Sequence, residues 1–375
     1  MRDILSSTRE YENWLAEKTD VSERALKRKH RKMAASAFAF LRASFYRWVE
    51  RWPEICPELA ARDRDVLLCV GDLHTENFGT WRDSRGRLVF GINDFDEACE
   101  APFSQDLVRL AASAMLAVDE HSLATPAPAI PDLLLRGYRG CLDAGGAPLV
   151  LRGAGSSPFD LPLGEPEDAE AFWRKKLDDE DAPVVDETEL PDVIVEIFRA
   201  AFPPGTRVEF RRQRKTGGLG SLGRRRYSAI WNSPNGRLAR EIKALVPSAA
   251  YWLQRRDSMP SQTASLLQRV IREPDPNLQV YEHWLLRQLA PDAEKINLAS
   301  LPDAGRAGFE PELIQAMGWE AANVHLGSWS PARLGDALHL IEREFRPDWL
   351  AHAASAMAGC MREDHRAFAE AAIDQ

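Results

Sequence analysis

The chain has few cysteines, and they follow no recognisable spacing. Its 375 residues contain five, an odd number, and no C-x-x-C occurs. A zinc site or a disulfide framework needs cysteines paired at short, regular spacing, so we expect neither. The five residues are Cys56, Cys69, Cys99, Cys141 and Cys360. This usage favours a reducing cytoplasm as the compartment.

A long apolar run and an excess of positive charge are also absent. No stretch approaches the roughly 18 apolar residues that a membrane-spanning helix needs. Charges lie throughout the N-terminal MRDILSSTREYENW, where a secretion signal needs an apolar core. The formal net charge is −9, which argues against a general nucleic-acid binder, because such binding depends on basic surface. We therefore expect a cytoplasmic protein without a membrane or nucleic-acid partner.

The composition provides for a large core. Hydrophobic residues make up 45% of the chain and include 11 Trp, so two domains, or two lobes around a cleft, are feasible. Helical periodicity dominates both ends, and strand-like alternation dominates a central block. We predict an α+β protein with four segments. They are 1–145, the first part of a helical catalytic lobe; 146–204, a linker or insertion; 205–300, a strand-rich lobe; and 301–375, the second part of the helical lobe.

Polar residues gather in one stretch, residues 69–110. Asp72 and Asn77 form a D-x-x-x-x-N pattern on a polar loop. Two short apolar runs, 78–81 and 87–92, flank the turn sequence Asp-Ser-Arg-Gly, which predicts a hairpin. The hairpin would return Asp94 towards the loop that carries Asp72 and Asn77.

These residue types suit phosphoryl transfer. One carboxylate, Asp72, would accept the proton of an attacking hydroxyl, while Asn77 and Asp94 would hold Mg²⁺ on the nucleotide phosphates. Asp96 would assist a second metal or organise the loop. The alternative interpretation is that these acids only decorate a solvated hairpin.

A glycine-rich segment lies in the strand-rich block. A dinucleotide-binding G-x-G-x-x-G requires a helix directly after it, but here a strand-like sequence follows. Strand, Gly-rich turn, strand, hairpin and a strand Lys is instead the order of a kinase phosphate-binding lobe. The predicted ATP-binding residues are Gly218, Gly220, Ser221, Gly223 and Lys243. Lys243 might equally be an ordinary solvated lysine, and the expected helix at 261–273 offers it no evident carboxylate partner.

The motifs resemble known families. Residues 71–77, GDLHTEN, and Asp94-Phe95-Asp96 are similar to motifs of aminoglycoside phosphotransferases and choline kinases. SAFAFLR (36–42), GDLHTENFG and NDFDEA resemble more closely a bacterial family known only as a domain of unknown function. The resemblance implies a kinase-like fold but no substrate, and it implies that Asp106 is architectural. Val70 departs from the pattern, because many phosphotransferases have His there.

The order of the pieces differs from that of ordinary kinases, in which the Gly-rich lobe comes first. Either the fold is circularly permuted, with the strand-rich lobe inserted between two helical segments, or the Gly-rich match is accidental. The function that we expect is an ATP- and Mg²⁺-dependent phosphotransferase acting on a small-molecule or protein hydroxyl. The alternatives are a nucleotidyl (AMP) transferase and a non-catalytic nucleotide-binding scaffold.

Three further residues have open roles. Arg42, within the SAFAFLR segment, would reach a phosphate or form a structural ion pair. The cluster Lys27–Lys32 is expected to be a solvated helix face. His325 is expected to be a satisfied helix-end histidine.

Overall fold

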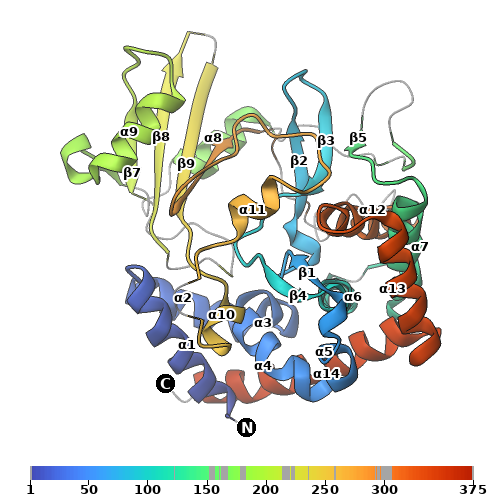
Figure 1. The fold of residues 1–375 in the computed structure, drawn as a ribbon. Helices are drawn as coiled ribbons and strands as arrows, with labels where there is room; N and C mark the ends of the chain where they lie inside the picture. Colours follow the sequence, from blue (N-terminus) through green and yellow to red (C-terminus); the bar gives the residue numbers. More distant parts are fainter. Residues whose placement is uncertain are drawn as a thin grey trace.

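The protein is mixed α+β and is seen here in a computed structural model (Figure 1). Helices form the lower body of the molecule in that view, and strands form the upper left part. The structure describes residues 2–121, 123–151, 157–159, 161, 168–177, 183–212, 220, 224–234, 236–256, 259–291, 293, 296 and 306–373.

The chain begins with short helices, and polar side chains set their starts. Asp3 Oδ1 accepts from the Ser6 amide at 2.9 Å, and Ser36 Oγ accepts from the Ala39 amide at 3.0 Å. Such caps satisfy amides that the first helical turn leaves unpaired. The helices are α1 (Ile4–Lys18), α2 (Glu23–Met33), α3 (Ala37–Ala43), α4 (Phe45–Ile55) and α5 (Pro57–Ala60).

The apolar stripe from Phe38 to Val49 does not form one helix, as its spacing suggested. The helix breaks at Ser44, whose backbone (φ −127°, ψ 48°) is not helical. The Ser44 hydroxyl donates to the Phe40 carbonyl at 2.6 Å, so a local side-chain bond competes with helix continuation. The residues of the stripe are nevertheless all buried, so the two helices share one apolar face.

The hairpin forms as predicted. Strands β2 (Phe78–Arg82) and β3 (Leu88–Ile92) pair antiparallel, and β5 (Leu149–Val150) joins β3. Asp83 Oδ1 closes the turn by accepting from the amides of Arg85 and Arg87, both at 2.9 Å. Below the hairpin, β1 (Val66–Cys69) pairs with β4 (Cys99–Pro102).

The helices of both chain ends pack into one body. Gly137 and Gly318 allow α7 and α12 to approach closely: a Cβ on Gly137 would lie 1.8 Å from the Gln315 carbonyl oxygen. The last helix, α14, packs against α3, α4 and α6, and Arg47 binds Asp364 through two hydrogen bonds of 2.8 Å. These helices are α6 (Phe103–His121), α7 (Ile130–Asp143), α12 (Arg306–Leu326), α13 (Pro331–Glu344) and α14 (Trp349–Ile373).

The strand-rich part is an antiparallel sheet in the order β10-β11-β9-β8-β7-β6. Helix α9 (Asp192–Ala201) covers one face, where its Ile194 and Phe198 join an apolar cluster with Tyr227 and Ile242 of the sheet. Residues 184–201, within the stretch predicted as a linker, thus lie with the sheet. The strands are β6 (Val184–Val185), β7 (Glu209–Arg212), β8 (Arg226–Ser233), β9 (Gly236–Ala244), β10 (Gln279–Tyr281) and β11 (Trp284–Leu289).

The opposite face of this sheet is partly polar. Its apolar patch, Ile230 and Ala239, packs against α8 (Ala169–Leu177). Since side chains alternate along a strand, Glu241 and Lys243 share that face with Ala239. Two short helices, α10 (Ala249–Leu253) and α11 (Thr263–Leu267), connect β9 to β10.

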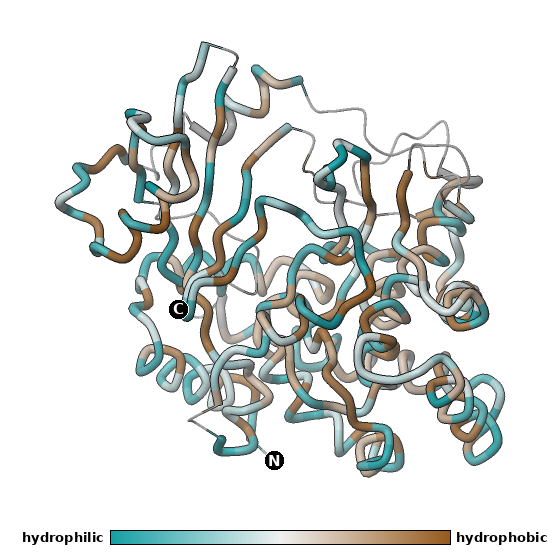
Figure 2. Tube along the Cα trace, turned by 45° about the horizontal axis from the view of Figure 1, so that its top comes forward, coloured by the Kyte–Doolittle hydropathy of each residue, from teal (hydrophilic) through white to brown (hydrophobic). Residues whose placement is uncertain are grey.

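The hydropathy of the trace agrees with these layers. Figure 2 shows hydrophobic segments along the strands, and hydrophobic and hydrophilic residues alternating around the turns of the outer helices. Among the helices of the described ranges, none combines the length and the apolar composition that crossing a bilayer requires.

Candidate active site

The hairpin and the sheet meet at a buried ion-pair cluster. Lys243 Nζ of β9 lies 3.2 Å from Asp94 Oδ1 and 2.7 Å from Asp96 Oδ1. Both acids follow β3 directly, so the hairpin return delivers them to this point. The side chains of Lys243 and Asp96 are only 5% and 7% exposed, whereas that of Asp94 is 21% exposed. The carboxylate partners of Lys243 therefore come from the hairpin and not from the expected helix at 261–273, of which only α11 is helical.

A second cation reinforces this contact. Arg224, at the start of the segment that leads into β8, binds Glu97 at 2.7 Å and lies 3.6 Å from Asp96. The other oxygen of Glu97 accepts from the Ala249 amide at 2.7 Å, at the start of α10. Glu97 thus connects the hairpin return to two parts of the strand-rich segment, a role that its sequence position did not indicate.

Asp72 is held by a buried arginine. Arg109 of α6 donates to Asp72 Oδ1 through both Nε (3.0 Å) and Nη2, and its Nη2 also donates to the Leu41 carbonyl at 2.8 Å. The guanidinium stacks on Trp48, 4.9 Å from the ring centroid. Burial raises the pKa of the Asp72 carboxyl to about 7; Arg109 lowers this pKa and Glu97 raises it further. A carboxyl that titrates near neutrality suits a general base.

Asp106 fixes the backbone that leads to Asp72. Its two oxygens accept from the amides of Val70 (2.7 Å) and Gly71 (2.9 Å). Gly71 has φ +80°, and a Cβ there would lie 2.2 Å from the Glu97 carbonyl oxygen, so only glycine fits. His325 is buried and contacts Tyr138 (3.0 Å) and Asp106 (3.3 Å), which makes it a packed and satisfied histidine.

Asn77 closes the polar loop and faces the hairpin return. Its Oδ1 accepts from the His74 amide at 2.6 Å, and its backbone carbonyl accepts from the Asn93 amide at 2.8 Å. The second bond joins Asn77 to the residue directly before Asp94. An amide oxygen has two lone pairs, so the His74 contact leaves one available to a metal ion.

The glycine-rich segment is described at Gly220 alone; the predicted residues Gly218, Ser221 and Gly223 lie outside the described residues. A Cβ on Gly220 would lie 3.2 Å from Asp72 Oδ2 and 3.4 Å from the Arg42 carbonyl oxygen. The segment between β7 and β8 therefore reaches the carboxylate at the other end of the site.

Oxygen donors suited to Mg²⁺ thus lie on the hairpin side of the site. Carboxylates and carbonyl oxygens are the ligands that this ion prefers. Asp94 and Asp96 present two carboxylates whose charge is balanced by Lys243, and Asn77 lies one hydrogen bond from their segment. The residues present therefore fit the ion.

Several site residues were not found by sequence reasoning. Arg109 looked like one more residue of a buried helix, and Arg224 like part of a basic run. A polar triad, Arg226–Glu241–Arg287, lies on the same sheet face as Lys243, with Arg287 Nε 2.8 Å from Glu241. The alternation Glu241–Ile242–Lys243 was the signal for this polar face.

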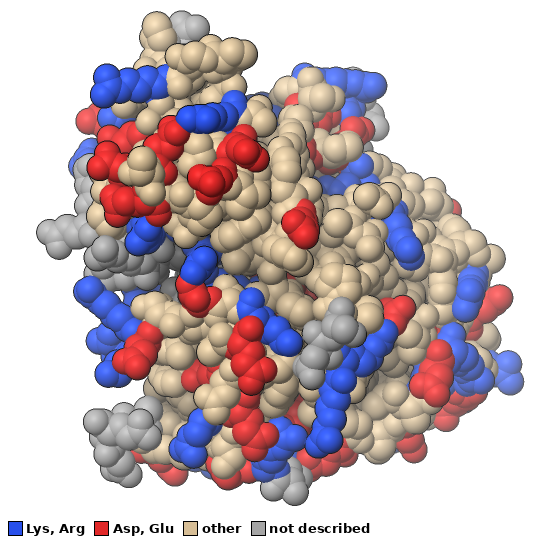
Figure 3. Space-filling model, turned by 60° about the vertical axis from the view of Figure 1, so that its left-hand side comes forward, with Lys and Arg blue, Asp and Glu red and all other residues tan. Residues whose placement is uncertain are grey.

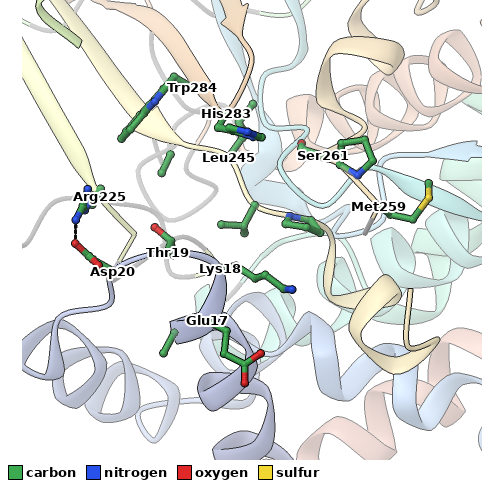
Figure 4. Close-up of a pocket in the computed structure, with 15 residues that line it drawn as sticks. Glu17, Lys18, Thr19, Asp20, Arg225, Leu245, Met259, Ser261, His283 and Trp284 are labelled. Carbon is green, nitrogen blue, oxygen red and sulfur yellow. Dashed lines mark ion pairs between the residues drawn. The ribbon is translucent and has the colours of Figure 1, made fainter. Parts of the chain in front are cut away.

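A separate pocket of about 620 Å³ lies behind the strand that carries Lys243 (Figure 4). It is lined by the end of α1, by Leu245 and by Trp284, and the ion pair between Asp20 and Arg225 spans one side of it. Ala244 lines this pocket, and neighbouring strand residues point to opposite faces, so Lys243 points away from it. None of the predicted site residues lines the pocket.

Comparisons with known proteins agree with part of the sequence resemblance. Residues 22–144 match the model of a family described as "Uncharacterized protein conserved in bacteria (DUF2252)". Among curated proteins and solved structures, none matches the chain. The matched range contains Asp72, Asn77, Asp94 and Asp96, and it ends before the sheet. The similarity to aminoglycoside phosphotransferases and choline kinases stays a prediction.

Proposed function

We propose that this protein is an ATP- and Mg²⁺-dependent phosphotransferase that acts on a hydroxyl acceptor. The observation that carries the proposal is the contact of Lys243 with Asp94 and Asp96, at 3.2 and 2.7 Å. It joins a strand lysine from a Gly-rich segment to acids that follow a hairpin. A kinase site needs these two groups together, one on the nucleotide phosphates and one on the metal.

A circularly permuted, kinase-like arrangement accounts for the chain order. Strands β7, β8 and β9 are neighbours in the sheet, the Gly-rich segment joins the first two, and Lys243 lies on the third. The helices on both sides of this segment pack together, as an insertion into one helical lobe requires. Chain termini at the surface make such a permutation physically tolerable.

Asp72 would act as the base. The acceptor oxygen attacks the γ-phosphorus while its proton passes to Asp72; the bond from the γ-phosphorus to the bridging oxygen breaks, and ADP leaves with the bond electrons. Arg109 binds Asp72 Oδ1, whereas Oδ2 lies on the side of Gly220. Arg109 therefore orients the carboxylate with one oxygen towards the Gly-rich segment.

The remaining residues would bind and orient the nucleotide. Lys243 would place a point charge on the phosphates, and Gly220 would let backbone amides approach them. Asn77, Asp94 and Asp96 would hold Mg²⁺, which neutralises charge on the transferring phosphoryl group.

Transfer of AMP is the second candidate, and the pairing of Asp72 with Arg109 favours it. A carboxylate engaged by a guanidinium is a weaker proton acceptor, and an AMP transferase needs the same metal and phosphate ligands without relying on this base. A non-catalytic nucleotide-binding scaffold would retain binding but form no product.

The test combines binding with product identification in four proteins: wild type, Asp72→Asn, Lys243→Ala and the control Lys27→Ala, an exposed lysine of α2. Bound ATP·Mg²⁺ raises the melting temperature by mass action, so binding is readable without chemistry. We expect Asp72→Asn to keep the shift and lose turnover, Lys243→Ala to lose most of the shift, and Lys27→Ala to match the wild type.

The product then separates the functions. ADP supports the phosphotransferase, whereas pyrophosphate with AMP on an acceptor supports the AMP transferase. A thermal shift without product across a broad acceptor panel, unchanged in Asp72→Asn, supports the scaffold. No shift in the wild type would refute nucleotide binding.

A further inference from the structure

Arg42 stands beside the carboxylate assigned as the base. Arg109, the partner of Asp72, also holds the Leu41 carbonyl, and Arg42 follows directly. The Arg42 guanidinium pairs with Glu76 of the polar loop and lies over Phe38, 5.3 Å from the ring centroid. Its side chain is 15% exposed, and that of Glu76 is 18% exposed. This cation therefore remains reachable from solvent on the helical side of Asp72.

Lys32 adds a second cation on this side. It is half-buried on α2, and burial together with the charges of Arg28 and Arg42 lowers its pKa, whereas Glu76 raises it. Lys32 and Arg42 therefore lie close enough to repel each other, with Glu76 as the carboxylate between them. Two cations that share one carboxylate leave a positive excess.

Lys29, one helical turn before Lys32, is only 1% exposed. Its ammonium lies 5.8 Å from the ring centroids of both Tyr11 and Tyr46, and no carboxylate of the described residues lies within ion-pair distance of it. Burial lowers the pKa of Lys29, while the charges of Glu12, Glu97 and Asp72 raise it. An unpaired buried cation costs stability, so its presence calls for a role beyond packing.

This excess contrasts with the rest of the protein. The chain carries a net charge of −9, and Figure 3 shows basic and acidic side chains interspersed over the face turned forward there. A local surplus of cations beside a catalytic carboxylate is therefore a property of this place and not of the whole surface.

We propose that the acceptor carries an anionic group, a phosphate or a carboxylate, which Arg42 and Lys32 bind beside Asp72. Lys29 acts as a positioning residue that adds positive potential from behind. The inference rests on the proposed function, because it assigns the acceptor side of the same site. Acceptors that carry ammonium groups, such as choline or aminoglycosides, would be repelled here.

The experiment titrates inorganic phosphate, and separately acetate, into protein saturated with a non-hydrolysable ATP analogue and Mg²⁺, by calorimetry. We expect saturable binding of at least one anion to the wild type. Arg42→Gln and Lys32→Gln should each weaken it about tenfold, the usual worth of a hydrogen bond to a charged group. The control Arg31→Gln, on the exposed side of the same helix, should bind like the wild type.

Two further variants separate binding from structure. Lys29→Met removes the buried charge and keeps the volume, so it should raise the melting temperature while weakening anion binding severalfold. A purely structural lysine would instead lower the melting temperature when replaced. Glu76→Gln releases Arg42 from its partner and should strengthen anion binding.

Three results would overturn the inference: no saturable anion binding, an equal loss in Arg31→Gln, or a loss of ATP·Mg²⁺ affinity in Arg42→Gln, which would assign Arg42 to the nucleotide. Nucleotide binding without anion binding would refute the acceptor inference alone. Anion binding without any ATP·Mg²⁺ binding would refute the phosphotransferase and the acceptor role together.

Discussion

The carboxylates at the two ends of the site are held by different parts of the chain. Asp72 is bound by Arg109, and both residues belong to the helical body. Asp94 and Asp96 are bound by Lys243, which comes from the sheet. One contact is internal to a body, whereas the other joins two bodies. The comparison teaches that the end with the base is fixed when the helices fold, while the metal end is complete only when the sheet docks.

Removing Arg109 should have the largest effect. Arg109→Met leaves Asp72 without its partner among buried groups, which typically costs about 3–5 kcal/mol of unfolding free energy. Urea denaturation would measure the loss. The double variant Arg109→Met/Asp72→Leu removes both charges and should recover most of it. A single-variant loss below about 1 kcal/mol would mean that the internal contact is not the rigid one.

Lys243→Met should cost less, about 2 kcal/mol, because Arg224 remains near Asp96 and Asp94 keeps some contact with solvent. Mg²⁺ should restore part of this stability, since a divalent ion can neutralise the two carboxylates in place of the ammonium. The same Mg²⁺ titration on Arg109→Met is the control and should restore nothing. Equal rescue of both variants would erase the distinction between the two ends.

The sequence predicted those features that follow from local patterns. The hairpin and the two strands at 278–289 were predicted because turn residues and alternation are readable in short windows. The break at Ser44 was missed because one hydroxyl decides it. The pairing of Asp72 with Arg109, and of Lys243 with Asp96, depends on how distant elements pack, and no spacing in the sequence encodes that distance. Sequence alone therefore provided the candidate residues, and the structure brought Lys243, Asp94 and Asp96 together.

The pH dependence of stability should differ between the wild type and Asp72→Asn. Burial raises the pKa of Asp72 to about 7 from an unfolded value near 3.9. The folded chain therefore holds this proton more tightly, and the resulting stability is full below about pH 4 and is lost as pH rises through about 7. The wild type should lose at most about 1.4 kcal/mol per pH unit in this window relative to Asp72→Asn. Parallel curves from chemical denaturation at pH 4.5–7.5 (roughly the window set by these pKa values) would contradict the raised pKa.

The smallest effect concerns the other ion pair that joins the two bodies. Arg225 and Asp20 are 43% and 70% exposed, so water and salt screen their attraction. Arg225→Gln should change the unfolding free energy by less than about 1 kcal/mol, and the difference should vanish in concentrated salt. A larger, salt-resistant loss would show that the bodies are joined at the pocket edge as firmly as at Lys243.

The packing of α14 against α3, α4 and α6 has a consequence for biosynthesis. A ribosome releases the chain from its N-terminus, so the early helices emerge long before their partner. Until residues 349–373 leave the exit tunnel, Arg47 lacks Asp364, and the apolar faces of the early helices stay uncovered. A nascent chain stalled before α12 would therefore present sticky helices to chaperones and proteases, and release of the last 25 residues of α14 would complete the body.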